Sequence, residues 1–484
     1  MAEGPGTTPA NSSRSLVTNT QDTICALSSA PGRAGVAVVR VSGPGARVAL
    51  AALAGRLPEP RRASLRTLRD PATGQEVDRA IVLFYAGPSS FTGEDVVEIF
   101  LHGGRAVIAR VLAALHGLGC RLAEPGEFAR RAFDNGRIDL TEAEGIADLI
   151  DAETEAQRRQ AVAQAGGLLH RLYDGWRGEL LDAMALTEAG IDFSDEADVA
   201  ADATARAREM VVSLGATIAV HLQDGRRGEI LRDGFRVVLA GPPNVGKSSL
   251  LNALARREAA IVSPEAGTTR DVIEVRLDLG GFAVIVSDTA GIREARGDIE
   301  REGIRRTFAE GRAADLVLWV MDASAPEREV PAALVEAGAP IVLVANKVDL
   351  VSLSADRSTV PPHRSLASPD PSLSSPRPRP LERESLGVSA TTGEGMAALV
   401  AMIADMVRER TMPDDGPVIT QARHREALED CARCLQDVLA QDVLQAELAA
   451  EDLRRASRAL GRITGKVDAE EVLGRIFSRF CIGK

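Results

Sequence analysis

The chain of 484 residues is 45% hydrophobic but only 3% aromatic, and its formal net charge at pH 7 is −12. The length predicts about three domains, and interiors built from Leu, Ala, Val and Ile favour helices and α/β layers. The negative charge excludes a protein that coats nucleic acid with its whole surface, so an RNA substrate must meet a local basic patch or a basic partner. The cysteines are few, scattered and odd in number, which excludes a disulfide framework.

The N-terminal third predicts a tail followed by an α+β domain. Residues 1–21 are polar and lack an apolar stretch, so we expect a disordered tail rather than a signal peptide. No apolar run reaches the roughly 18 residues of a membrane span, and we expect a cytoplasmic protein. Within residues 22–139, short apolar runs alternate with glycine turns. The predicted strands lie at 36–39, 81–84 and 96–100, and the predicted helix at 106–118.

The remainder predicts a helical bundle interrupted by an inserted domain. Strand signals are absent from residues 140–230, alternate with helices over 231–408, and disappear again over 409–484. Within the insert, residues 352–385 are rich in Pro, Ser and Arg and predict a flexible surface segment. One apolar helical stripe predicts bundle core at Leu168, Leu172, Trp176, Leu180 and Met184. A second predicts core at Leu428, Cys431, Leu435, Val438 and Leu439.

Cys431 and Cys434 form a C-x-x-C pair within this second helical pattern. A zinc site needs further ligands, and neither a second cysteine pair nor a nearby histidine is present. We therefore interpret both residues as ordinary buried or half-buried thiols.

The most specific motif begins at the end of a predicted buried strand, residues 235–240. Residues 241–249 read Gly-Pro-Pro-Asn-Val-Gly-Lys-Ser-Ser and precede a leucine-rich helix, which is the context of a phosphate-binding loop. Backbone amides and the helix N-terminus would face the phosphates. Lys247 would contact the β- and γ-phosphates, and Ser248 would bind Mg²⁺. The expected GTP contacts of this loop are Asn244, Val245, Gly246, Lys247, Ser248 and Ser249.

Three further motifs follow in the order expected for a P-loop, Ras-like GTPase domain. Thr269 is the candidate second magnesium ligand, in a switch loop. In Asp288-Thr-Ala-Gly291, Asp288 would hold a metal-bound water and the Gly291 amide would sense the γ-phosphate. Asp349 can accept two hydrogen bonds from guanine N1 and N2, which favours GTP over ATP. The set resembles the translation-factor class of GTPases. The other expected nucleotide contacts are Ser263, Thr268, Thr289, Ala290, Asn346, Lys347, Ser389 and Ala390.

The sequence departs from many GTPases directly after this Asp-Thr-Ala-Gly motif. Ile292 stands where a glutamine often orients the attacking water, so catalysis must come from elsewhere. Asn244 resembles the asparagine with which potassium-activated GTPases hold K⁺ beside the phosphates. The alternative is an ordinary loop asparagine.

The chain as a whole resembles the MnmE (TrmE) family of tRNA-modification GTPases. The resemblance covers residues 22–484 and includes the GTPase motifs above. Its other marks are Asp22–Ile24, Pro31–Arg33, Val39–Gly43, Ser90–Asp95, Pro125–Phe128, Arg131–Phe133, Asp139–Glu144 and Phe480–Lys484.

This resemblance implies a reaction that residue spacing does not reveal. Such proteins act with the flavoprotein MnmG (GidA), which carries FAD, on the wobble uridine U34 of certain tRNAs. They add a carboxymethylaminomethyl or aminomethyl group at C5, with glycine or ammonia as the amine. A folate, 5,10-methylene- or 5-formyl-tetrahydrofolate, supplies the carbon. The resemblance also implies a homodimer formed by a folate-binding N-terminal domain and an α2β2 heterotetramer with the partner.

The same resemblance implies roles for individual residues. Arg40, Glu98, Arg137 and Lys484 would contact the folate, with Arg137 standing where the family commonly has lysine. Cys481 would lie near that pocket, and a nucleophilic role for it stays open because the sequence identifies no base beside it.

In the GTPase domain, the resemblance implies that Glu300 orients the attacking water, and a plain surface glutamate is the alternative. Hydrolysis would be coupled to the meeting of two GTPase domains. The implied K⁺ ligands are Asn244, Thr268 and the carbonyls of Ser263 and Glu265.

A different function class remains open on the GTPase motifs alone, namely a regulatory or ribosome-assembly GTPase without modification chemistry. The N-terminal domain and the tail from Cys481 to Lys484 favour the modifying enzyme. That tail has the cysteine spacing of a prenylation box, but Gly483 and Lys484 do not fit one.

Overall fold

The computed structural model describes most of the chain, which divides into two compact units. Unit 1 comprises residues 1–143 and 465–484, and unit 2 comprises residues 144–464. The predicted tail, 1–21, and nearly all of the predicted insertion, 352–384, lie outside the described residues. The described ranges are 22–192, 197–224, 226–256, 260–261, 274–288, 314–326, 329–351, 385–411, 416–441, 446–467 and 470–483.

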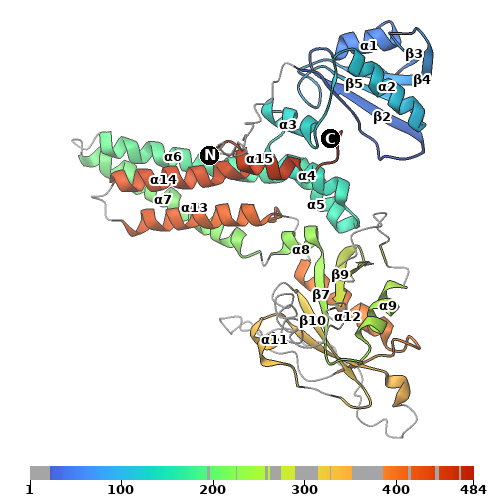
Figure 1. Cartoon of the computed structure of the whole chain (residues 1–484). Helices are drawn as coiled ribbons and strands as arrows, with labels where there is room; N and C mark the ends of the chain where they lie inside the picture. The colour runs from blue at the N-terminus through green and yellow to red at the C-terminus, as the bar shows by residue number, and fades with distance from the viewer. Residues whose placement is uncertain are drawn as a thin grey trace, which may run out of the picture. The chain divides into compact units, whose positions relative to one another are not determined.

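Unit 1 is built on a mainly antiparallel sheet with strand order β3-β4-β5-β2-β1-β6. One face of the sheet is apolar, with Val39, Val82 and Ile99 buried, because side chains alternate between faces along a strand. Two helices contact the strands and contribute Leu50 and Val111 to this core (Figure 1). This is the predicted α+β domain. Its elements are β1 (Ile24–Leu27), β2 (Ala34–Ser42), α1 (Ala46–Ala54), β3 (Ser64–Arg69), β4 (Glu76–Tyr85), β5 (Val96–Gly103), α2 (Arg105–Gly117) and β6 (Arg121–Leu122).

The C-terminal segment of the chain also belongs to unit 1. α3 (Glu127–Asp134) contacts α15 (Glu470–Phe477), and the Phe133 and Phe477 ring centroids lie 6.5 Å apart. Gly126 precedes α3, and a Cβ there would collide with the Phe477 carbonyl. The sequence grouped residues 465–484 with the second helical segment, 409–484, whereas in the structure they belong to the same compact unit as the N-terminal domain.

Unit 2 contains the helical bundle and the inserted body. Each of four helices contacts two of the others in the cycle α6–α7–α13–α14, so helices from distant parts of the sequence lie side by side (Figure 1). The chain between α7 and α13 forms the inserted body, which confirms the predicted discontinuous bundle. The helices are α4 (Leu140–Asp151), which crosses the division between the units, α5 (Glu155–Ala165), α6 (Leu168–Asp192), α7 (Ala197–Leu222), α13 (Ala422–Ala440) and α14 (Ala446–Thr464).

The predicted core stripe of α6 is only partly correct. Trp176 and Leu180 are buried in the core, and Leu172 and Met184 are half-buried and pack against it, whereas Leu168 is half-buried outside this core cluster. A spacing of four residues exceeds the helical repeat of 3.6, so the stripe rotates away from the core along a long helix. The buried positions instead alternate steps of three and four, at Leu169, Tyr173, Trp176, Leu180 and Ala183. On α13, by contrast, all five predicted residues are buried or pack against the core.

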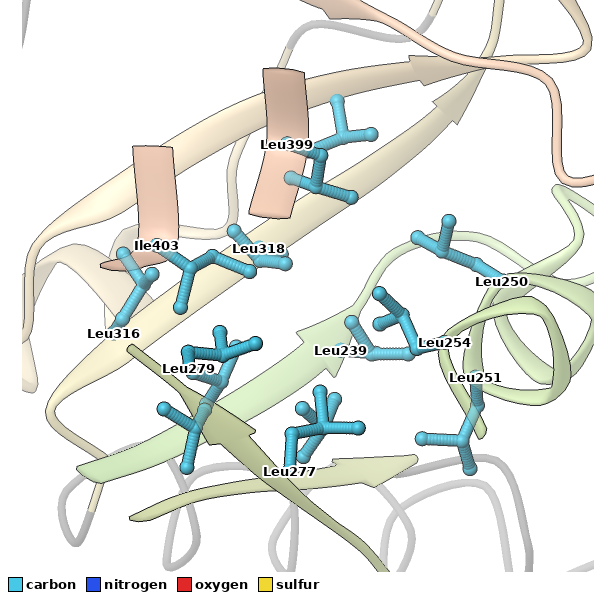
Figure 2. Close-up of a cluster of buried hydrophobic side chains, with 14 of the residues drawn as sticks. Leu239, Leu250, Leu251, Leu254, Leu277, Leu279, Leu316, Leu318, Leu399 and Ile403 are labelled. Atoms are coloured by element: carbon cyan, nitrogen blue, oxygen red, sulfur yellow. The ribbon is translucent and has the colours of Figure 1, made fainter. Parts of the chain in front are cut away.

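The inserted body contains a sheet of order β12-β11-β10-β7-β9-β8, parallel except for the β8–β9 pair. The apolar run of β10 has side chains in two separate clusters, with Leu316 and Leu318 in one and Trp319 in the other. Such runs are typical of parallel strands covered on both faces. Figure 2 shows the first cluster, between the sheet and helices α9 and α12. The elements are α8 (Arg227–Asp233), β7 (Phe235–Ala240), α9 (Lys247–Ala255), β8 (Glu274–Leu279), β9 (Phe282–Asp288), β10 (Leu316–Asp322), α11 (Ala332–Glu336), β11 (Ile341–Asn346), η1 (Val348–Leu350), β12 (Leu386–Gly387) and α12 (Met396–Thr411).

Candidate functional site: a nucleotide site and a docked C-terminal tail

The phosphate-binding loop lies between the carboxyl end of β7 and the N-terminus of α9. In α/β folds with a parallel sheet, ligands bind at the carboxyl ends of the strands, where the strand order reverses. Here that place is β7, because β9 pairs with one side of it and β10 with the other. Gly241 and Gly246 both have positive φ, 145° and 93°. A Cβ at Gly241 would collide with the Val320 carbonyl, and one at Gly246 would collide with the Asn346 amide nitrogen. The loop therefore packs directly against β10 and β11, which only glycine permits.

Three predicted nucleotide-site residues are brought together at this loop. The Lys247 ammonium donates to the carbonyls of Gly241 and Pro242 at 2.9 and 2.8 Å. Its burial lowers the pKa of Lys247, whereas the nearby Asp288 carboxylate opposes that shift. The Ser248 hydroxyl donates to Asp288 Oδ2 at 2.6 Å. A hydroxyl and a carboxylate in contact are oxygen ligands of the kind Mg²⁺ prefers, so these residues fit the predicted metal.

The guanine-specificity motif is connected to the same loop. The buried Asn346 side chain donates to the Val245 carbonyl at 2.9 Å and accepts from the Ala390 amide at 3.1 Å. Lys347 donates to the Asn244 carbonyl at 2.9 Å. One asparagine thus joins the phosphate loop to the Ser389-Ala390 element, so three motifs that are remote in sequence form one site.

The remaining described residues of the nucleotide site lie around this framework. Asp349 is half-buried on η1, directly after β11, and Ser389 is fully buried with its hydroxyl accepting from the Thr392 amide. Asn244 has φ 64° and an exposed side chain, and Ser249 is also exposed. The Asn244 side chain is therefore accessible to solvent, and that of Asp349 is partly accessible.

Sequence reasoning missed Asp322, at the carboxyl end of β10. Its carboxylate accepts from Lys347 Nζ at 2.7 Å and from the Ser324 hydroxyl at 2.6 Å. The hydrogen bond from Lys347 is the main reason that the pKa of Asp322 is lowered to about 2. An aspartate that ends a buried apolar strand is the signal that could have identified it.

Several predicted site residues lie outside the described residues. The structure therefore does not describe the K⁺ ligand set beyond Asn244, the water-orienting glutamate or the last residue of the tail. These residues are Ser263, Glu265, Thr268, Thr269, Thr289, Ala290, Gly291, Glu300 and Lys484.

A second group of predicted residues meets in unit 1. Arg40 on β2 faces Glu98 on β5 in the strand register, and its Nη2 lies 2.9 Å from Glu98 Oε1. The Arg40 guanidinium also lies over the rings of Phe91 and Phe128, at 5.7 and 5.6 Å from their centroids. It reaches the Gly483 carbonyl at 3.5 Å.

The C-terminal tail is anchored beside this pair. Ser28 donates to the Gly483 carbonyl at 2.8 Å, and Ile482 pairs with Pro125 in an isolated β-bridge. Gly483 has φ 101°, and a Cβ there would collide with the Leu27 carbonyl. The adjacent Cys481 is a free, exposed thiol. The described part of the tail thus contacts Arg40 and Ser28 through the Gly483 carbonyl, and the role of Lys484 and Cys481 at a folate pocket stays a prediction.

Arg137 is the predicted folate contact that this group does not include. It is exposed, and its side chain lies beside Gly93. Among the described residues, no hydrogen bond or ion pair joins Arg137 to Arg40 or Glu98. A role for Arg137 at the same pocket remains a prediction.

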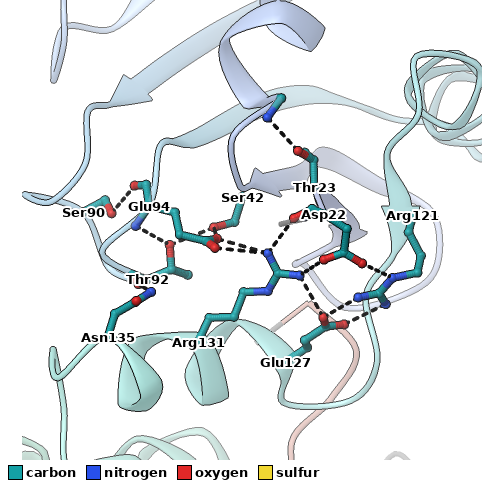
Figure 3. A network of polar contacts seen from close by, with 11 residues as sticks. Asp22, Thr23, Ser42, Ser90, Thr92, Glu94, Arg121, Glu127, Arg131 and Asn135 are labelled. Carbon is teal, nitrogen blue, oxygen red and sulfur yellow. Dashed lines mark hydrogen bonds and ion pairs between the residues drawn. The ribbon is translucent and has the colours of Figure 1, made fainter. Parts of the chain in front are cut away.

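An ionic network centred on the buried Arg131 and Glu127 holds the loop around Ser90 against α3 (Figure 3). Arg131 donates to Asp22 Oδ1 at 2.6 Å, to Glu127 at 3.1 Å and to Glu94 at 3.2 Å. Arg121 donates to Glu127 at 2.6 Å and to Asp22 at 2.8 Å. Although burial alone would raise the pKa of Glu127, Arg121 and the Glu124 amide lower it. These contacts explain several residues that carried the sequence resemblance without an assigned role.

Cys431 and Cys434 are both buried and free. Burial raises the pKa of Cys431 to about 12, so this thiol stays protonated near neutral pH. The described residues contain no cluster of three or more His, Cys, Asp or Glu side chains arranged to hold a metal. Within the same part of the chain, no helix combines the length and apolar character needed to cross a membrane.

Comparisons with known proteins agree with the resemblance seen in the sequence. A family model for the MnmE helical domain matches residues 140–481, and one for the N-terminus of the GTP-binding protein TrmE matches residues 23–137. The chain is 53% identical to the tRNA modification GTPase MnmE of Parvibaculum lavamentivorans, with 96% of this chain and 100% of that protein covered. It is 50% identical to the MnmE of Caulobacter vibrioides at the same coverage.

Among solved structures, the G domain of the T. maritima FeoB iron transporter is 26% identical, with a TM-score of 0.25. That match covers 36% of this chain and 98% of the FeoB domain, and a TM-score this low supports no argument about the whole chain. The family assignment rests on the full-length relatives and on the family model that spans most of the chain. The chain belongs to the MnmE family of tRNA modification GTPases.

Proposed function

We propose that this chain is a potassium-dependent GTPase that acts with an FAD-carrying partner of the MnmG type on the wobble uridine U34 of certain tRNAs. The product carries a carboxymethylaminomethyl or aminomethyl group at C5, with a tetrahydrofolate as the one-carbon donor. The protein works in the cytoplasm as a homodimer that assembles with its partner into an α2β2 complex. The observation that carries this proposal is the joined nucleotide site, in which Asn346 links the phosphate loop to the base-side motifs.

In this proposal the phosphate loop binds GTP through its amides, and Lys247 exchanges its two loop carbonyls for phosphate oxygens. Ser248, Asp288 and Thr269 would hold Mg²⁺ directly or through water, and the ion would supply charge neutralisation at the phosphates. Asp349 accepts two hydrogen bonds from the guanine base. Its half-buried position at the end of β11 supports this role.

The proposed potassium site begins at Asn244, whose exposed side chain and positive φ place it at the loop surface. Thr268 and the carbonyls of Ser263 and Glu265 complete the ligand set. Glu300 orients the attacking water. Hydrolysis depends on the meeting of two GTPase domains, which completes this ligand set.

The proposed folate site includes Arg40, Glu98, Arg137 and Lys484. Arg40 offers a guanidinium that is fixed by Glu98 and by two aromatic rings, and such a group suits a carboxylate or a polar ring edge. The anchoring of the tail at Gly483 supports placing Lys484 and Cys481 near it.

Nucleoside mass spectrometry of bulk tRNA tests this proposal. Cells lacking the protein should lose 5-carboxymethylaminomethyluridine and 5-aminomethyluridine, and the wild-type chain should restore them whereas Glu300→Ala should not. Purified protein should hydrolyse GTP faster in KCl than in NaCl at equal ionic strength. Unchanged wobble uridines would refute the modification role and leave a regulatory GTPase as the alternative.

A further inference from the structure

The chain passes between the helical bundle and the GTPase body twice. The first passage runs from the end of α7 through α8 into β7, and the second returns from α12 to the start of α13. Arg425 lies in the first turn of α13, at the end of the return passage. Its side chain reaches across to the outgoing passage.

Arg425 bonds to three residues of the outgoing passage, one through each guanidinium nitrogen. Its Nη2 donates to Asp224 Oδ1 at 2.7 Å, its Nε to Glu229 Oε1 at 3.0 Å, and its Nη1 to the Leu222 carbonyl at 3.2 Å. The side chains are largely buried, with exposed fractions of 17% for Arg425, 9% for Asp224 and 6% for Glu229. We call these four residues the junction cluster.

Two further contacts extend the junction cluster to the return passage before α13. Asp224 Oδ2 accepts from the Ile419 amide at 3.3 Å. Gly228, at the start of α8, lies against Ile419 so closely that a Cβ there would collide with its carbonyl. The outgoing and return passages are therefore joined by Arg425 and Asp224 together.

The junction cluster differs in kind from the interiors on either side of it. The bundle and the GTPase body have separate hydrophobic clusters, the first containing Trp176 and Leu428 and the second containing Leu239 and Leu316. Apolar contact is non-directional, whereas charge-assisted hydrogen bonds from a planar guanidinium demand one geometry. A buried ionic junction therefore specifies an orientation that apolar packing alone would not.

We propose that Arg425 is a positioning residue that couples the GTPase body to the helical bundle, so that conformational change driven by GTP reaches the modification reaction through the junction cluster. The coupling part of this inference rests on the proposed function. The orientation part does not, because it concerns only how the two bodies are joined. Loss of Arg425 uncouples the bodies while each retains its own core.

The orientation part is tested by the distance between two spin labels in the full-length protein. Val212→Cys on α7 and Val335→Cys on α11 introduce labels at positions that are 51% and 59% exposed. Cys481→Ser removes the exposed native thiol, and the other native cysteines are buried. With Arg425 the distance distribution should be narrow, and Arg425→Ala should widen it at least twofold. An unchanged width would overturn the positioning role.

The coupling part is tested by two activities of the full-length protein with its partner. Arg425→Ala should retain GTP hydrolysis within about twofold but lower tRNA modification at least tenfold, mainly in kcat. Arg425→Lys keeps the charge but loses the planar set of guanidinium donors. Its rate of tRNA modification should therefore lie between those of the wild type and Arg425→Ala. Arg454→Ala is the control, because Arg454 pairs with Glu188 and Glu451 on the surface of the bundle, away from the junction cluster, and it should change neither activity.

Fluorescence of Trp176 and Trp319 monitors whether each body of the variant is folded. If hydrolysis and modification fall in parallel in a folded Arg425→Ala protein, or if modification is unchanged, the coupling role is overturned. If the wild-type protein neither hydrolyses GTP nor modifies tRNA, the proposed function fails instead. The label distances would still decide the orientation role.

Discussion

Glu144 is the charged group whose replacement should affect the helical bundle most clearly. Its side chain is only 6% exposed, and its two oxygens accept from Arg423 at 2.6 and 2.7 Å and meet His424 Nε2 at 2.9 Å. These partners lie on α13, whereas Glu144 lies on α4. The three residues therefore connect helices that are about 280 positions apart in sequence.

The electrostatics set the size of the expected effect. Burial alone would raise the pKa of Glu144, but Arg423 and His424 outweigh it and lower the pKa from 4.5 to about 2. At neutral pH this difference corresponds to roughly 3 kcal/mol of folding free energy. Because the folded-state pKa is depressed, this stability is present above pH 4.5 and is lost as the pH falls toward 2. About 0.8 kcal/mol should be lost between pH 6 and pH 4.

Glu144→Gln should therefore lower the unfolding free energy of the bundle at pH 6 by about 3 kcal/mol, since it leaves Arg423 without its charged partner. The substitution should also remove the contribution of Glu144 to the pH dependence of the unfolding free energy. Urea unfolding followed by Trp176 fluorescence measures both effects. The only other tryptophan, Trp319, lies in the GTPase body and is replaced by Phe to leave one reporter.

Glu155→Gln is the matched control. Hydrogen bonds from Arg158 and Arg159 also lower the pKa of Glu155 to about 2, but this carboxylate is exposed on α5. Water and salt screen such pairs, so the control should show no measurable change. The reasoning would be refuted if Glu144→Gln matched the wild type at pH 6, or if it lost as much stability as the wild type between pH 6 and pH 4.

Three other outcomes are expected from the geometry. Gly483→Ala should displace the tail, because its Cβ would collide with the Leu27 carbonyl, and it should abolish tRNA modification without changing GTP hydrolysis. Gly474→Ala, where a Cβ meets open space, should retain both activities. Asn346→Ala leaves the buried Val245 carbonyl and the half-buried Ala390 amide without this partner and should lower the stability of the GTPase body by about 2–3 kcal/mol, measured through Trp319 fluorescence. Asp349→Ala removes the two hydrogen bonds proposed to guanine and should weaken GTP binding on the order of 100-fold by calorimetry, with unchanged thermal unfolding as its control.

The elements of the nucleotide site were predictable because each depends on a short stretch of sequence. The strand at 235–240 and the following loop and helix were placed correctly, since an apolar run, two glycines and Lys247 are local signals. The predicted strands of the N-terminal domain were likewise confirmed within β2, β4 and β5. The stripe on α6 was partly wrong because a four-residue spacing ignores the rotation of the helix.

The contacts between distant segments were not predictable in the same way. The sequence by itself determined the fold class, the phosphate loop and the family, because periodicity and motifs are properties of neighbouring residues. Only the tertiary structure decided that Lys347 meets Asp322, that Gly483 meets Arg40, and that Arg425 joins Asp224 to Glu229. Those pairings depend on how strands and helices far apart in the chain pack, and an arginine or glutamate looks the same in sequence whether its partner is water or a buried charge.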